Sequence, residues 1–181
     1  MTTDHMTGAE LQTLREACGL TREEFADMAQ VQARTLKHWE SGRAGVPADV
    51  AALAVALDWA VIRTAAGLVA DAKRPAGYKG DMVALVRYKS AQDLPRGALI
   101  GGAPGDPQRA ALLHGAAVMH ARHALAASGQ AVRVVWFDAV HFSAWCAEHG
   151  GPDTPMARQA WAQASVPAQA IPHRADQPPA A

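Results

Sequence analysis

The chain has 181 residues, 17 acidic and 17 basic side chains, and no formal net charge. That length fits one medium domain or two small ones. The balanced charge and 50% hydrophobic content exclude a uniformly disordered chain and a supercharged nucleic-acid tail. Because 42 residues are alanine, the core is expected to depend on the Leu, Val, Ile, Trp and Phe side chains.

Cysteine content and hydropathy set the cellular context. Two cysteines, Cys18 and Cys146, exclude a disulfide framework and a four-cysteine zinc site. The N-terminal MTTDHMTG contains an acid and no apolar segment, so no secretory signal is expected. The longest apolar stretch, residues 51–70, is interrupted by Asp58 and Arg63, which favours a soluble helix over a membrane span. We therefore expect a soluble, cytoplasmic protein without a membrane partner.

The first part of the chain predicts short helices joined by tight turns. Thr7 with Glu10, and Thr21 with Glu24, have the T-x-x-E spacing of a capping box at a helix start. Gly19 is expected to end the first helix, because glycine readily adopts the left-handed conformation that follows a helix.

Two further helices are predicted before residue 73. A short one runs from about residue 32 to Glu40, with Leu36 and Trp39 facing inward, and Ser41-Gly42 ends it. A longer helix opens after Pro47. It carries two apolar stripes, so we expect it to be sandwiched between its own bundle and something else. The first stripe is Val50, Leu53, Ala54, Leu57 and Val61, and the second is Val55, Trp59, Ile62 and Ala66.

The second half predicts a small α+β region. Strand signals are short β-branched or apolar runs, and helix signals are alanine-rich periodic segments. The tail from residue 167 contains several prolines and is expected to be disordered. The predicted segments are a linker at 73–80, strands at 82–88 and 132–137, a Gly/Pro-rich loop at 94–107, and helices at 108–128, 141–148 and 154–161.

Residues 10–47 carry the most specific pattern. One helix ends at Gly19-Leu20, TREEFA begins the next at Thr21, a turn follows at 29–31, and QARTLKHWE-SG spans residues 32–42. This resembles the XRE/Cro-type helix-turn-helix family, whose recognition helix ends in W-E-x-G. The resemblance covers about a third of the chain and implies an N-terminal DNA-binding bundle.

The predicted third helix has the side chains that DNA recognition needs. A helix in the major groove presents polar or basic side chains on its outer, N-terminal face. Arg34 can bond guanine O6 and N7 bidentately, worth about 1–3 kcal/mol against a wrong base, and Ala33 can touch a thymine methyl. The candidates for base contacts are Gln32, Ala33, Arg34, Lys37 and His38, and those for phosphate contacts are Thr21, Arg22, Thr35 and Arg43.

The charge distribution favours an oriented contact. Residues 1–64 hold 6 basic and 9 acidic side chains, whereas residues 32–43 hold Arg34, Lys37 and Arg43 against Glu40 alone. The alternative is a solvated helix face without a ligand. The acidic balance of the bundle argues against strong nonspecific DNA affinity. Glu40 is expected to cap or pair near the next helix.

A second resemblance lies in residues 132–162. A strand ending in Phe137-Asp138, an aromatic helix, a Gly-Pro-Asp turn and a last helix with Trp161 look like the C-terminal part of YdiL-like proteins and anti-CRISPR-associated (Aca-type) autoregulators. In that family this part makes the homodimer, so the resemblance implies a dimerisation domain. This chain departs from the pattern by its Gly/Pro loop and the extra helix at 108–128.

Dimerisation also has a reason of its own. Two helix-turn-helix units about 34 Å apart read both halves of a palindrome. The alternative is that the same aromatic side chains form a monomeric core. The candidate interface residues are Trp59, Ile62, Trp136, Phe137, Phe142 and Trp145.

Catalytic and metal sites are not expected. Histidines at 114, 120, 123, 141 and 149, with Cys146, suggest a metal site, but such helical histidines are often surface residues. The glycines at 97–105 lack the pattern of a phosphate-binding loop. No Ser/His/Asp or Cys/His set has defensible spacing. We therefore expect no enzyme activity, no metal and no cofactor.

The sequence predicts a mainly α protein with a small α+β C-terminal region. Its parts are a helix-turn-helix DNA-binding domain with a long connecting helix (1–73), an α+β dimerisation domain (81–166) and a disordered tail (167–181). The predicted function is a sequence-specific transcriptional regulator, a homodimeric repressor of its own operon that binds an inverted repeat in duplex DNA. Two alternatives stay open: an antitoxin-like or partner-sensing regulator, and an RNA-binding autoregulator.

Overall fold

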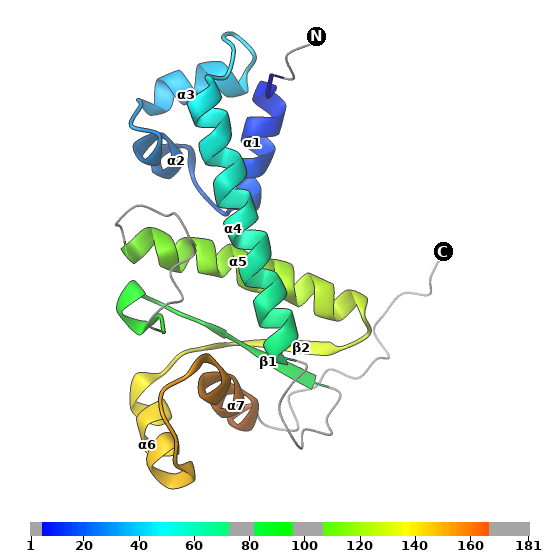
Figure 1. The fold of residues 1–181 in the computed structure, drawn as a ribbon, viewed down its shortest axis with the longest axis vertical. Helices are drawn as coiled ribbons and strands as arrows, with labels where there is room; N and C mark the ends of the chain where they lie inside the picture. Colours follow the sequence, from blue (N-terminus) through cyan, green and yellow to red (C-terminus); the bar gives the residue numbers. More distant parts are fainter. Residues whose placement is uncertain (1–4, 73–81, 96–106, 167–181) are drawn as a thin grey trace.

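The computed structural model describes residues 5–72, 82–95 and 107–166. A bundle of short helices sits at one end of a long helix, and a helix–sheet layer sits at the other (Figure 1). In chain order the elements are α1 (Gly8–Ala17), α2 (Arg22–Met28), α3 (Ala33–Glu40), α4 (Ala48–Ala72), β1 (Met82–Arg87), the 3-10 turn η1 (Ala91–Asp93), α5 (Pro107–Ala127), β2 (Ala131–Trp136), α6 (Ala139–His149) and α7 (Pro155–Ser165).

Local capping sets the starts of the first two helices. Thr7 Oγ1 accepts from the Glu10 amide at 3.2 Å, and Glu10 accepts from the Thr7 amide at 2.7 Å. Thr21 and Glu24 repeat the arrangement at the start of α2. Both predicted capping boxes are confirmed. Gly19 follows α1 with φ +70°, as predicted for a residue that closes a helix.

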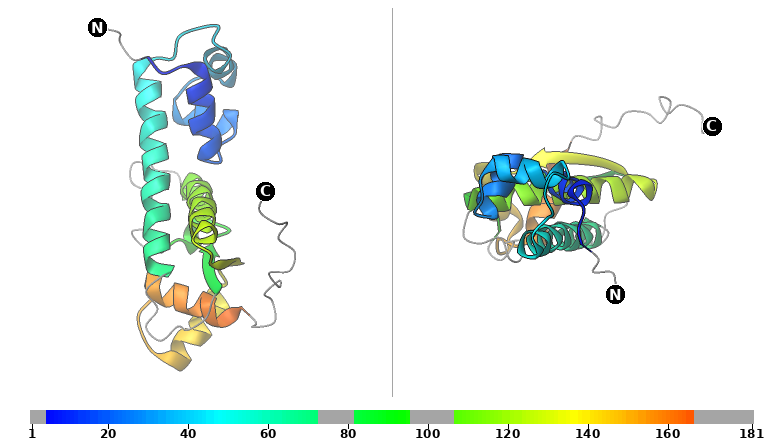
Figure 2. Two further views of the ribbon diagram at one scale, coloured as in Figure 1. Left: turned by 90° about the vertical axis from the view of Figure 1, so that its right-hand side faces the viewer. Right: turned by 90° about the horizontal axis from the view of Figure 1, so that it is seen from above.

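The long helix α4 connects the two halves of the molecule. Its 25 residues extend about 37 Å at 1.5 Å per residue. Two views show α1–α3 against its N-terminal half and α5 crossing its C-terminal half (Figures 1 and 2). By length and composition alone α4 could also cross a membrane, but its buried residues belong to the largest hydrophobic cluster of the described chain.

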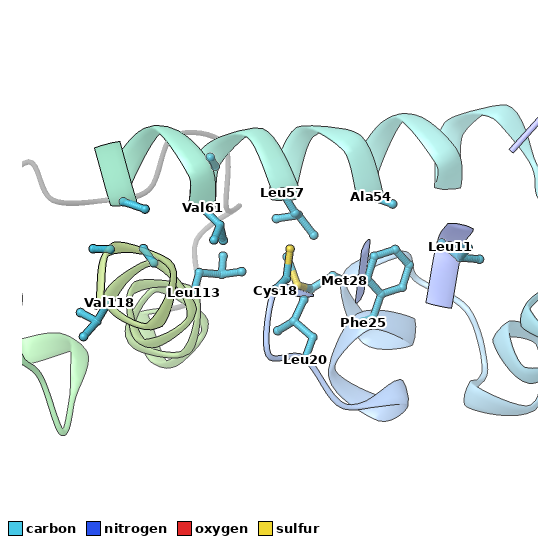
Figure 3. Close-up of a cluster of buried hydrophobic side chains, with 14 of the residues drawn as sticks. Leu11, Cys18, Leu20, Phe25, Met28, Ala54, Leu57, Val61, Leu113 and Val118 are labelled. Carbon is cyan, nitrogen blue, oxygen red and sulfur yellow. The ribbon is translucent and has the colours of Figure 1, made fainter. Parts of the chain in front are cut away.

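One face of α4 packs against both the N-terminal bundle and α5. Leu57 lies over Cys18 and Leu20 of the bundle, and Val61 lies over Leu113 of α5 (Figure 3). Within the described residues no other element covers the second stripe of α4, so its burial against something else stays a prediction. Its second stripe is solvent-exposed, because bundle and α5 share the first stripe in succession; its exposed large members are Val55, Trp59 and Ile62.

The two strands form a parallel pair linked by α5. The register runs from Met82 opposite Ala131 to Arg87 opposite Trp136. One face of the sheet, with Val83 and Leu85, packs into the cluster that α4 and α5 share. The other face packs against α6 and α7 in a second cluster, whose buried residues are Ala84, Val86, Tyr88, Phe137, Phe142, Trp161 and Ala162.

Most predicted elements of the second half are confirmed, with shifted ends. Helix α6 begins at Ala139 because Asp138 Oδ1 accepts from the Val140 and His141 amides, both at 3.0 Å. Helix α7 continues to Ser165, beyond the predicted end at Trp161. The predicted linker at 73–80, the core of the Gly/Pro loop (96–106) and the tail from 167 lie outside the described residues.

Candidate nucleic-acid interface

The turn between α2 and α3 is held by backbone hydrogen bonds. The Val31 amide donates to Ala26 O at 2.8 Å, and the Gln30 amide donates to Asp27 O at 3.1 Å. These two bonds form a Schellman motif, which places Gln30 in the left-handed region with φ +55°. The chain therefore reverses within three residues and enters α3 with Gln32 as the N-cap.

The outer face of α3 exposes the polar residues that the sequence singled out. Leu36 is fully buried and Trp39 is half-buried, so the inner face is as predicted. Gln32, Arg34 and Lys37 are exposed. The remaining base-contact candidates, Ala33 and His38, are partly exposed. The side chain of the N-cap residue Gln32 makes no capping hydrogen bond to the first amides of α3.

Glu40, at the end of α3, joins three helices. Its Oε1 accepts from Arg15 Nε of α1 at 2.6 Å, and its Oε2 accepts from Arg22 Nε of α2 at 2.7 Å. Arg15 also donates from Nη1 to Leu20 O at 2.7 Å. The side chains of Arg15 and Glu40 are only 7% and 2% exposed. This Arg15–Glu40–Arg22 network fixes the end of α3 against both of its neighbours.

The network also sets the ionisation of Glu40. Burial alone would raise the pKa of this carboxyl, but the hydrogen bonds from Arg15 and Arg22 outweigh burial and lower its pKa below the ordinary value. The carboxylate in turn raises the pKa of Arg22 by accepting its hydrogen bond. Glu40 therefore pairs, as the sequence predicted, and it does so with α1 and α2 instead of with α4.

The phosphate-contact candidates lie at helix ends. Thr21 is exposed at the start of α2, Thr35 is partly exposed in the first turn of α3, and Arg43 is exposed just after α3. The Nε of Arg22 is bound to Glu40, a partner that the sequence analysis did not predict. That bond brings the start of α2 next to the end of α3.

Two supporting residues were missed by the sequence analysis. A Cβ on Gly8 would lie 2.1 Å from Trp39 O and 2.6 Å from Glu40 O, so only glycine allows α1 to meet the end of α3. Arg15 occupies the inward face of α1 with Leu11 and Cys18. A lone arginine at an inward helical position signals a buried carboxylate partner, and that signal was available.

The candidate dimer residues divide into two groups. Trp59, Ile62 and Trp136 are exposed on the surface. Phe137 and Phe142 are buried inside the chain, with ring centroids 5.4 Å apart. Trp145 is half-buried and stacks on His149. The two phenylalanines thus have almost no surface to offer a second copy.

The histidines of α5 make separate contacts. His114 is buried edge-on to Tyr88, with centroids 4.9 Å apart. His120 Nε2 lies 3.3 Å from Ala17 O, and His123 is exposed. Within the described ranges, no three His, Cys, Asp or Glu side chains are placed to hold a metal ion.

A comparison with family models identifies the bundle. Residues 7–66 match the model of a helix-turn-helix domain. The match spans α1–α3 and most of α4, about a third of the chain, and it suggests a DNA-binding regulator. No curated protein matches the sequence. The comparisons give no support for the YdiL-like or Aca-type resemblance of residues 132–162.

Within the matched residues, α2 and α3 are the two helices joined by the tight turn at Ala29–Val31. The Arg15–Glu40–Arg22 network lies at the C-terminal end of α3, and the exposed residues Gln32 and Arg34 lie at its N-terminal end. The domain therefore holds one end of α3 rigidly and leaves the other end open to solvent.

Proposed function

We propose that the protein is a sequence-specific transcriptional regulator, a dimeric repressor of its own operon that binds an inverted repeat in duplex DNA. The observation that carries the proposal is the exposed N-terminal face of α3, with Gln32, Arg34 and Lys37 on a helix anchored through Glu40. Repression follows from occlusion of polymerase, and it needs no cofactor, metal or catalytic step.

In the proposed complex α3 enters the major groove. Arg34 bonds the O6 and N7 atoms of a guanine, and Ala33 meets a thymine methyl. Gln32, Lys37 and His38 contact neighbouring base edges. Phosphates are bound by Thr21, Thr35 and Arg43, and by the two Nη nitrogens that Arg22 keeps beyond its Nε bond to Glu40.

The charge of the domain fits selective binding. Residues 1–64 carry a net charge of −3, with 6 basic and 9 acidic side chains, so the domain as a whole is repelled by DNA. The segment from Gln32 to Arg43 is net basic, with three basic side chains against Glu40 alone. Binding in one orientation is therefore favoured, and nonspecific affinity is low.

The test is a footprint of the purified full-length protein on the DNA upstream of its own gene. Arg34→Ala is expected to weaken protection by about tenfold to a hundredfold, which corresponds to the loss of one bidentate base contact. Arg122→Ala is the matched control, because Arg122 is exposed on α5 away from the domain.

Two outcomes separate the proposal from its alternatives. Protection of an inverted repeat that Arg34→Ala removes and Arg122→Ala keeps supports the dimeric repressor. No protection at low salt overturns the operator proposal. Binding of the matching transcript in place of the duplex would instead establish an RNA-binding autoregulator.

A further inference from the structure

The two outer edges of the sheet differ in whether side chains cover their backbone groups. The edge of β1 is covered by glutamines of α7. Ala84 N donates to Gln163 Oε1 at 2.9 Å, Gln163 Nε2 donates to Met82 O at 2.9 Å, and Gln159 Nε2 donates to Ala84 O. Two side chains thus bond the outward backbone groups of Met82 and Ala84 as a neighbouring strand would, which closes this part of the β1 edge to another strand.

The outer edge of β2 has no such cover in the part of the chain that the structure describes. The Phe137 amide donates to Arg87 O at 2.8 Å, and Arg87 lies opposite Trp136. In a parallel ladder this register directs the N–H and C=O groups of Arg133, Val135 and Phe137 toward β1. The same groups of Val132, Val134 and Trp136 point outward, where no other described residue bonds them.

The side chains on this edge are apolar and exposed. Val134 is 41% exposed and Trp136 is 53% exposed. Exposed apolar side chains beside unpaired backbone groups are the features by which one strand recruits another.

We propose that the β2 edge pairs antiparallel with β2 of a second copy, about a two-fold axis at Val134, to give the four-stranded sheet β1-β2-β2-β1. The inference rests on the proposed dimer and names its interface. Val134 then lies opposite Val134 of the partner subunit, and Val132 lies opposite Trp136 of the partner subunit.

This register makes the edge complementary to itself. All three outward residues of each β2 fall in hydrogen-bonded pairs. Trp136 gains a β-branched neighbour, a pairing that stabilises antiparallel strands. The two copies of Arg133 lie opposite valines at position 135, so like charges do not meet directly.

A dimer paired through β2 would have no free sheet edge, and this also favours a second copy over an unrelated strand as the partner of β2. The outer edges of the four-stranded sheet are the two β1 strands, which Gln159 and Gln163 already cover. No free edge remains, so assembly stops at the dimer. A six-residue strand edge buries less than the roughly 800 Å² per partner of a standard interface, so the free dimer is weak and DNA with two half-sites strengthens it.

The exposed stripe of α4 is the competing surface. Val55, Trp59 and Ile62 lie on it, and both views in Figure 2 place α4 and β2 on opposite sides of α5. One dimer interface about a single axis therefore uses either surface but not both. Unlike β2, the stripe offers no unpaired backbone groups.

Sedimentation of the full-length protein without DNA tests the proposal. Val134→Lys and Val134→Glu each place like charges opposite one another at the axis, and each is expected to weaken self-association at least about tenfold. An equimolar mixture of the two variants is expected to restore association, because Lys and Glu then face each other. Val140→Lys is the matched control, because Val140 is a valine 78% exposed on α6, outside the strand.

Three results overturn the proposal: a wild-type protein that stays monomeric at about 100 μM, well above a micromolar dissociation constant, single variants that associate like wild type, or a mixture that does not recover. Loss of association in Ile62→Lys with none in the Val134 variants would assign the interface to α4.

Amide exchange of the wild-type protein gives a reading that does not depend on variant folding. The Val134 and Trp136 amides are expected to become protected as protein concentration rises, whereas the Val135 amide, bonded to β1, is protected throughout. Rapid exchange of Val134 at every concentration would overturn the inference. Neither measurement uses DNA, so a failed footprint does not change how their results are interpreted. A monomeric result overturns the proposed interface, and binding of one copy to a half-site is then measured separately.

Discussion

Arg15 donates from Nε to Oε1 of Glu40 at 2.6 Å, in an ion pair almost completely removed from solvent. Arg22, whose side chain is partly exposed, donates from Nε to the other carboxylate oxygen of Glu40. Because a buried charge without its partner is costly, this pair ties the orientation of α3 to the folding of the whole bundle. The orientation of α3, the helix proposed to enter the major groove, therefore depends on Arg15 and Glu40, which are buried and are not among the proposed DNA contacts.

Glu40→Gln is expected to lower the free energy of unfolding by about 3 kcal/mol, because it leaves the buried Arg15 guanidinium with only the exposed Glu16 as a counter-charge. Urea denaturation at pH 7 measures this. Glu16→Gln is the control: Glu16 also contacts Arg15, at 3.2 Å, but it is 56% exposed, so its loss should cost at most about 1 kcal/mol. Equal stability of the two variants would contradict the assigned role of Glu40.

Local signals in the sequence predicted the bundle well. Thr7, Thr21 and Gly19 act within one helical turn, so their effect does not depend on tertiary structure. The partners of Arg15 and Arg22 lie 25 and 18 residues away. Such pairs can be predicted only when it is known which helices meet, and the sequence alone gave Arg22 no carboxylate partner.

The C-terminal half was predicted as elements but not as an assembly. Strand and helix periods placed β1, β2, α5, α6 and α7 within a few residues. The same aromatic pattern fits a monomer core or a dimer interface, because both remove apolar area from water. The structure separates them: Phe137 and Phe142 pack inside, while Trp136, one residue away on the opposite face of β2, stays exposed.

Gly8→Ala is expected to destabilise the protein by about 1–3 kcal/mol, because the added Cβ would overlap the carbonyl oxygens of Trp39 and Glu40. DNA affinity should fall as well, since the end of α3 must move. Thermal unfolding and the footprint measure the two effects.

Gly67→Ala provides a control of opposite sign. Gly67 is exposed within α4, and a Cβ there would meet nothing within 4 Å. Alanine at this position should stabilise the helix by about 0.5–1 kcal/mol. A stabilised Gly8→Ala variant would show that α1 does not press against α3 in solution.

His114 is expected to make the stability of the protein depend on pH in weakly acidic solution. Burial, with a smaller effect of Arg87, lowers the pKa of His114 from 6.5 to about 4. The unfolded chain binds the proton first as pH falls, so stability is complete above about pH 6.5 and is lost progressively down to about pH 4. The loss is about 3 kcal/mol.

His114→Leu removes the titrating group while filling similar space. Its stability curve in urea, measured at pH 7, 6, 5 and 4, should be flatter than that of wild type across this window. His123→Leu, at an exposed position on the same helix, should keep the wild-type slope. Identical pH dependence of wild type and His114→Leu would contradict the buried, neutral state of this ring.

Gln163→Ala tests the cover on β1. The substitution removes the acceptor for Ala84 N, and leaving that amide unpaired should cost about 1–3 kcal/mol. Gln92→Ala, an exposed residue of η1, should change stability by no more than about 0.5 kcal/mol.

Gln163→Ala should also change the assembly of the protein. The variant exposes part of the β1 edge while β2 is already paired in the proposed dimer, so a further strand can add to β1. Sedimentation should then show species larger than a dimer for Gln163→Ala, whereas wild type stops at the dimer. An unchanged dimer together with unchanged stability would mean that the glutamines do not close this edge.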